Sequence, residues 1–142
     1  MYCGVSQSIF EQPEVSRLSR REVREGITRA GRPEDTRFMV TPVFGNPFRR
    51  EVIIDVGTRY EKGLLWFEPL PHFRPAGFGV DKGLDVPEVQ QALQLPLARA
   101  YLRWARFPFV QVNAAPPLNG VWLNDYRYAG AAPYGWSAVK LQ

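Results

Sequence analysis

The sequence predicts an α+β fold in which an N-terminal amphipathic helix packs on a mainly antiparallel sheet of about six strands. Three observations predict it: a helical pattern opens the chain, short strands then follow one another through tight turns, and no strand–helix–strand alternation points to a parallel sheet. The 142 residues, 45% of them apolar, suit one domain with a buried core. We expect a lead segment over residues 1–13 and a single domain over residues 14–142.

Residues 14–30 are predicted to form the helix. Pro13 suits a first helical turn, and Gly31 is a stop signal. Apolar side chains gather on one broad face of this helix, whereas most of its arginines lie elsewhere, so the helix is amphipathic and basic. Two interpretations are open: a solvated helix docked on the sheet, or a segment that lies near an anionic membrane surface.

Short runs of alternating apolar residues predict the strands. Prolines at positions 69, 71 and 75 are expected to end the third strand and to begin an irregular loop that reaches about Gly83. Two short helices follow this loop, so the prediction is a two-helix insertion between strands three and four. The predicted strands are 37–41, 51–56, 60–67, 107–112, 121–128 and 134–141, and the inserted helices are 87–93 and 97–106.

The charge distribution is uneven and modestly basic. The net charge is +4, and residues 89–142 contain five basic residues but only one acid, Asp125. Because the excess is small and the chain shows no reader helix, zinc-finger spacing or glycine-rich clamp, no nucleic-acid partner is expected. The single cysteine, Cys3, excludes an intrachain disulfide and fits the cytoplasm. No apolar run approaches the roughly 20 residues of a membrane span.

The chain carries no recognisable catalytic machinery. His72 is the only histidine, and together with one cysteine it falls short of the ligands that a zinc site needs. No G-x-S-x-G sequence marks a nucleophile, and no glycine-rich loop opens a helix after a strand. We therefore predict no catalytic residue, no metal and no cofactor in this chain.

One group of polar residues stands out as a candidate ligand-binding site, because a lone acid is accompanied by several arginines. Asp125 and Arg127 have the same parity on one predicted strand, so they are expected to point to one face. The group has two open interpretations: an ion-pair network that fixes strand register, or a site for an anionic group. Its members are Asn46, Arg49, Arg50, Arg106, Asp125 and Arg127.

Several segments occur in a familiar order: TPVFGNPFRR at 41–50, then EVIIDV, RWARFPFV at 103–110, NDYRY at 124–128 and YGWSAVKL near the end. This order resembles the C-terminal soluble domain of a bacterial family of inner-membrane, metal-dependent hydrolases, also described as LexA-binding, membrane-associated hydrolases. The resemblance covers residues 14–142. In that family, a bundle of transmembrane helices precedes the domain and carries the metal ligands, so no catalytic position is carried over to this chain.

The resemblance implies a cytosol-facing accessory domain of a membrane-associated hydrolase, inactive alone, at the inner face of the membrane. Its partners would be the membrane-embedded hydrolase half or an anionic membrane surface. The alternative is a stand-alone binding module for an anionic ligand or a protein partner, which the basic C-terminal third and the proline-rich segment 69–75 suggest. The lack of metal ligands and of a nucleophile argues against an independent soluble hydrolase. The sequence leaves the oligomeric state and the substrate open.

Overall fold

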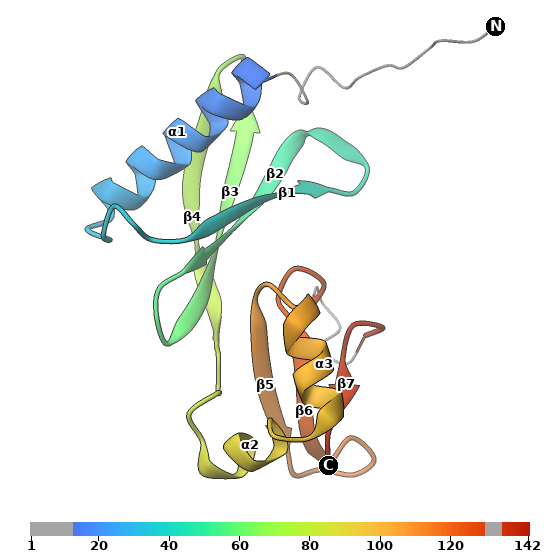
Figure 1. Cartoon of the computed structure of the whole chain (residues 1–142). Coiled ribbons are helices and arrows are strands. Elements are labelled where there is room, and N and C mark those ends of the chain that lie inside the picture. The colour runs from blue at the N-terminus through green and yellow to red at the C-terminus, as the bar shows by residue number, and fades with distance from the viewer. Residues whose placement is uncertain (1–12, 130–134) are drawn as a thin grey trace, which may run out of the picture. The chain divides into compact units, whose positions relative to one another are not determined.

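Seven strands and three helices make up the part of the chain that the structure describes, residues 13–129 and 135–142 (Figure 1). This structure is a computed structural model. The strands form two antiparallel sheets with the orders β1-β2-β3-β4 and β5-β6-β7. The elements are α1 (Pro13–Arg29), β1 (Phe38–Val43), β2 (Asn46–Asp55), β3 (Arg59–Phe67), β4 (Pro71–Asp81), α2 (Pro87–Ala92), α3 (Pro96–Trp104), β5 (Pro108–Asn113), β6 (Gly120–Asp125) and β7 (Val139–Lys140).

The predicted α+β class is confirmed, but the prediction of one sheet with about six strands is wrong. The strands belong to a four-stranded and a three-stranded sheet. The two short helices lie between β4 and β5, and not between the third and fourth strands. This difference arises because most of the segment predicted as an irregular loop forms strand β4.

Strand β4 tolerates its prolines because it lies at the edge of the four-stranded sheet. Pro71 is its first residue, and Pro75 lies within it. A proline lacks the amide hydrogen that a ladder needs, so it is confined to edges and strand starts. Between the two prolines, the amide of Phe73 donates to Glu22 Oε1 on α1 at 3.2 Å. The prolines therefore mark an edge strand here, and not a loop.

Most other predicted boundaries agree with the structure to within one or two residues, as is usual for element ends. The exceptions are the second strand and the last two strands. The segment left between the first two predicted strands, residues 42–50, contains only the turn at Phe44–Gly45, so β2 begins at Asn46. The strand predicted to reach Tyr128 ends at Asp125, and the described part of the last one contains only β7. Pro13 begins α1, whereas the rest of the predicted lead segment, including Cys3, lies outside the described residues.

The described residues form two compact units. Unit 1 contains the residues up to Ile54 together with Lys62–Gly77, and unit 2 contains Asp55–Glu61 together with the residues from Phe78 onward. The boundary therefore crosses strands β2, β3 and β4.

In unit 1, helix α1 packs on the sheet through Val23 and Ile27, which are buried. The ring of Phe73, from β4, fits between Gly26 of α1 and Gly63 of β3, where any added methyl group would overlap it. The guanidinium of Arg24 donates to the backbone oxygens of residues 34 and 36 at 2.6 Å, which ties the helix to the chain that follows it.

In unit 2, helices α2 and α3 pack against β5 and β6 (Figure 1). Val89, Ala98, Val110 and Leu123 belong to this apolar core. An aromatic cluster surrounds Tyr60, whose ring lies 5.4 to 5.9 Å from the rings of its two partners and whose hydroxyl donates to a backbone oxygen of β5 at 2.9 Å. The other members of the cluster are Phe107, Phe109 and Tyr126.

Candidate functional site

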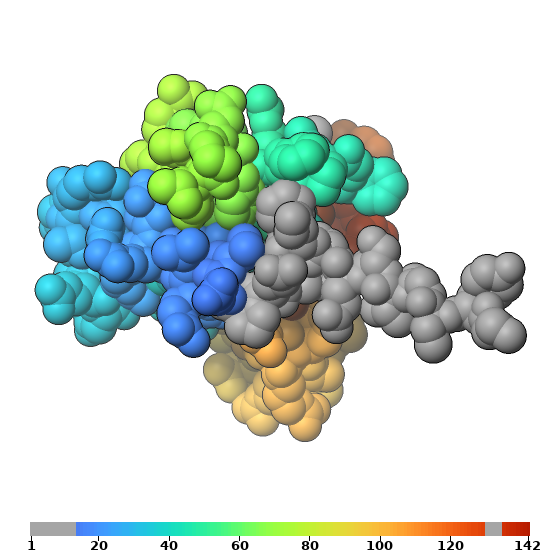
Figure 2. Space-filling view, turned by 90° about the horizontal axis from the view of Figure 1, so that it is seen from above, coloured from blue at the N-terminus to red at the C-terminus, as the bar shows by residue number. Residues whose placement is uncertain are grey.

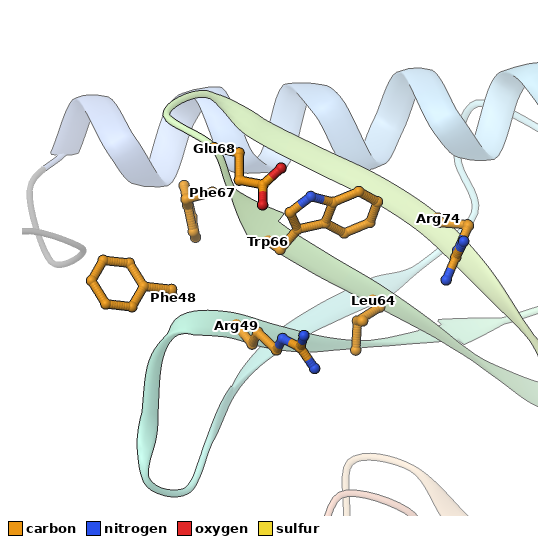
Figure 3. Close-up of a pocket in the computed structure, with 7 residues that line it drawn as sticks. All are labelled: Phe48, Arg49, Leu64, Trp66, Phe67, Glu68 and Arg74. Atoms are coloured by element: carbon orange, nitrogen blue, oxygen red, sulfur yellow. The ribbon is translucent and has the colours of Figure 1, made fainter.

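A hollow of about 260 Å³ lies on the part of the four-stranded sheet that belongs to unit 1. Successive residues of a strand point to opposite faces, so His72 and Arg74 point away from the face on which Phe73 meets α1. Trp66 shares this helix-free face, because its ring stacks on His72 with centroids 5.6 Å apart. The residues that line the hollow are Phe48, Arg49, Leu64, Trp66, Phe67, Glu68 and Arg74 (Figure 3).

The hollow combines two guanidinium groups with an apolar wall. Figure 3 shows Trp66 between Glu68 and Arg74, with Arg49 on the neighbouring strand β2. The Arg74 guanidinium lies 5.9 Å from the centre of the Trp66 ring, within range of a cation–π contact. Arginines suit the recognition of carboxylates and phosphates because their planar donors match these anions. Glu68 adds one acceptor at the margin.

An ion pair continues this face of the sheet. Lys62 Nζ lies 3.1 Å and 3.2 Å from the two carboxylate oxygens of Glu51 on the adjacent strand. The lysine side chain is only 10% exposed, so its charge is directed at Glu51. We therefore assign Lys62 a structural role in the sheet and not a binding role in the hollow.

The other two predicted site residues of unit 1 have local structural contacts. Asn46 Oδ1 accepts a hydrogen bond from the amide of Phe48 at 3.0 Å, which supports the start of β2 after its turn. Arg50 is half-buried and donates weakly to the backbone oxygens of Pro47 and Arg49 at 3.4 Å and 3.3 Å. Of this predicted trio, only Arg49 lines the hollow.

The remaining three predicted residues, Arg106, Asp125 and Arg127, come together in unit 2. Arg127 Nε and Nη2 donate to the carboxylate of Asp125, the latter at 2.7 Å. The amides of Arg127 and Arg106 donate to the same carboxylate at 3.0 Å and 2.9 Å. Asp125 is fully buried, whereas Arg106 is an exposed residue. The Asp125–Arg127 pair therefore closes the turn after β6, which is the structural interpretation of this group.

The electrostatics of this pair follow from burial and hydrogen bonding. Burial alone would raise the pKa of Asp125, but the hydrogen bonds from Arg127 and from the Arg106 amide outweigh it and lower that pKa. The hydrogen bond to Asp125 raises the pKa of Arg127 further above its ordinary value. Both groups are held in their charged forms.

Aromatic rings cover the ion pair. The Arg127 guanidinium lies 5.2 Å from the centre of the Trp104 ring and 4.8 Å from that of Tyr128. These two rings stack on each other with centroids 5.6 Å apart, and Trp136 contacts Tyr128 at 5.0 Å. Because the rings and Asp125 both engage Arg127, this arginine is a poor choice for binding an external anion.

Tyr101 joins the same network and leads to a testable prediction. Its hydroxyl donates to the backbone oxygen of Ser137 at 2.6 Å, and burial, assisted by the charge of Asp125, raises the pKa of Tyr101 to about 12. A pKa that is raised on folding contributes stability below the unfolded value of about 10, and this stability is lost as the pH rises through the folded value. We expect Tyr101→Phe to remove part of the alkaline loss of stability between about pH 10 and pH 12.

Urea unfolding measured across this pH range, together with the absorbance of tyrosinate, checks the prediction. The wild-type chain should show a late-titrating tyrosine that Tyr101→Phe lacks. If the tyrosinate absorbance of the variant rose at high pH by as much as that of the wild type, the assignment to Tyr101 would be contradicted.

Sequence reasoning missed Trp66 and Arg74 because it placed the segment from Pro69 to Gly83 in a loop, so the faces of β3 and β4 could not be aligned.

In the described residues, no group of three or more His, Cys, Asp or Glu side chains could hold a metal ion. Among the described helices, none is both long and apolar enough to cross a membrane.

The class that the fold defines is an α+β protein with two antiparallel sheets. Comparisons with family models, with curated proteins and with solved structures find no match to this chain. The resemblance to the membrane-associated hydrolase family therefore stays a prediction.

Proposed function

We propose that this chain is a non-catalytic binding domain whose hollow on unit 1 recognises an anionic ligand with an apolar ring or chain. The observation that carries the proposal is the placement of Arg49 and Arg74 on either side of an apolar wall that contains Leu64 and Trp66. The guanidinium groups would hold the anion, and the wall would hold the apolar part. Glu68 at the margin would accept a hydrogen bond from a hydroxyl or amine of the ligand.

Three small probes distinguish binding to the two arginines from binding to the apolar wall: phenyl phosphate, inorganic phosphate and benzyl alcohol. We expect phenyl phosphate to bind most tightly and to shift the NMR signals of the Trp66 indole and of the Arg49 and Arg74 side chains. Replacing either arginine with glutamine should weaken binding by about tenfold or more, because each removes a charge-assisted hydrogen bond.

Arg103→Gln is the matched control, since Arg103 is an exposed arginine on α3 in unit 2. It should leave the affinity unchanged. Equal weakening by Arg103→Gln would show non-specific attraction to a basic protein, and an absence of shifts at Trp66 with all three probes would exclude the hollow as the site.

We propose, as a second function, that the chain serves as the cytosol-facing accessory domain of a membrane-associated, metal-dependent hydrolase. The motif order and the basic character of the first helix support this setting. The test is the reading frame upstream of Met1, which should encode apolar spans with a histidine-rich motif. Metal-dependent phosphoesterase activity of the purified chain alone would contradict both proposals.

A further inference from the structure

Four large apolar side chains of unit 1 are exposed to solvent, and they come from three different parts of the chain. They are Leu18 of α1, Phe44 of the β1–β2 turn, Phe48 of β2 and Leu70 of the β3–β4 turn. Phe44 is fully exposed, and the exposed fractions of Leu18, Phe48 and Leu70 are 45%, 60% and 62%. We call these four residues the apolar end of unit 1. Single exposed apolar residues are ordinary, but a group of them marks an interaction surface.

The apolar end is one surface and not a scatter of residues. Leu18, Phe48 and Leu70 line the same hollow of about 270 Å³, and Pro69 and Pro71 contribute to its wall. Phe44 belongs to the turn two residues before β2, so it lies within about 13 Å of Phe48 along the hairpin. In Figure 2, the start of α1 (blue), the β1–β2 hairpin (teal) and the β3–β4 region (yellow-green) of unit 1 all reach the face turned to the viewer.

The charges around this surface favour an anionic partner. Arg17 and Arg20 are exposed on the first turns of α1 and flank Leu18 in the sequence, and the exposed Arg49 follows Phe48 in β2. Within four residues of the apolar end, the described chain has six arginines against four acids, Glu14, Glu22, Glu51 and Glu68. Two of these acids are already engaged, because Glu22 accepts from the Phe73 amide and Glu51 from Lys62. Arginine side chains can lie along an apolar surface while their charged heads reach outward, which places them at the level of lipid phosphates.

We propose that the apolar end of unit 1 docks on an anionic lipid bilayer, with Phe44 and Leu70 inserted below the headgroups and the flanking arginines in contact with lipid phosphates. Phe44 and Leu70 both lie in short turns, which can insert a single apolar side chain among the lipid headgroups without exposing a long strand edge. The binding strength should grow with the buried apolar area and with the content of anionic lipid. This inference rests on the membrane-associated setting proposed above, but it does not require a ligand in the hollow of Arg49 and Arg74.

Co-sedimentation of the full chain with vesicles tests the inference. We expect binding to phosphatidylcholine vesicles that contain phosphatidylglycerol, and much weaker binding to pure phosphatidylcholine or at high salt. The double variant Phe44→Ser and Leu70→Ser should bind the anionic vesicles at least about tenfold more weakly, because it removes the two most exposed apolar anchors. Both changes are at solvent-exposed turn residues, so the thermal unfolding midpoint should stay near that of the wild type.

Phe78→Ser is the matched control, because Phe78 is 59% exposed but belongs to unit 2. It should bind vesicles like the wild type, and so should Arg74→Gln, which separates this inference from the ligand-binding hollow. Failure of the wild-type chain to bind phosphatidylglycerol vesicles would overturn the proposal. It would also be overturned if Phe78→Ser lost as much binding as the double variant, or if the double variant only converted a dimer to a monomer.

Discussion

Replacing Asp125 with asparagine should lower the free energy of unfolding by about 3 to 5 kcal/mol, which is the usual effect of removing one partner of a buried ion pair. The carboxylate is fully buried and receives hydrogen bonds from the guanidinium and the amide of Arg127 and from the amide of Arg106. Asparagine has nearly the same shape but leaves the largely buried Arg127 charge without its counter-ion. Equilibrium unfolding in urea measures the change.

The control for this variant is Asp81→Asn. Asp81 lies 3.9 Å from Arg59, but its side chain is 86% exposed, so the substitution should have little effect on stability. If Asp125→Asn changed the free energy of unfolding as little as Asp81→Asn does, the pair would not be the structural element described above.

The same variant has a pH dependence with a defined sign. Because the folded-state pKa of Asp125 is lowered, its contribution to stability is present above the ordinary aspartate pKa of about 3.9 and is lost as the pH falls through the folded value. The difference in stability between the wild type and Asp125→Asn should therefore narrow below about pH 4. Unfolding curves at several acidic pH values would show this narrowing, and a constant difference would contradict it.

Gly26→Ala should destabilise the protein by about 1 to 3 kcal/mol, although alanine normally stabilises a helix interior by about 1 kcal/mol relative to glycine. The sign is reversed because the methyl group would overlap the ring of Phe73, which is held on its other side by Gly63. Neither the ring nor the sheet behind it can move away easily, since protein interiors are closely packed.

A double-mutant cycle with Phe73→Ala isolates this effect. Once the ring is removed, Gly26→Ala should become stabilising by up to about 1 kcal/mol, as helix propensity alone predicts. Ser16→Ala, at an exposed position of α1, is the control and should have a small effect in both backgrounds. If Gly26→Ala still lowered the free energy of unfolding in the Phe73→Ala background, the glycine would be there for another reason.

Local patterns predicted the helices and most strands because their signals lie within a few residues of each other. The alternation in EVIIDV and the proline and glycine at the two ends of α1 are signals of this kind. Strand β4 could not be predicted from local chemistry, because its prolines are compatible with a strand only at an edge, and the edge position is a property of the whole sheet.

The candidate site shows the same limit. The predicted strand placed Asp125 and Arg127 on one face, and the two residues do form a pair. Arg127 lies, however, in the turn after β6 and not on the strand, and its backbone amide also donates to Asp125. Grouping these residues with Asn46, Arg49 and Arg50 had no local basis, and the structure places the two trios in different units. Trp66 and Arg74 become neighbours only through the pairing of β3 with β4.

The division into units has a consequence for how this protein can be divided into fragments. The chain passes from one unit to the other after Ile54, after Glu61 and after Gly77, so neither unit is encoded by a single stretch of the gene. Only a cut after Glu61 divides both units, because a fragment that ends there lacks residues 62–77 of unit 1 and everything from Phe78 onward in unit 2. A fragment that ends at Gly77 keeps all of unit 1 and carries residues 55–61 of unit 2. The fragment from Phe78 onward would lack Tyr60, around which the aromatic cluster of unit 2 is built. Recombination at a single junction cannot exchange one unit between two such proteins.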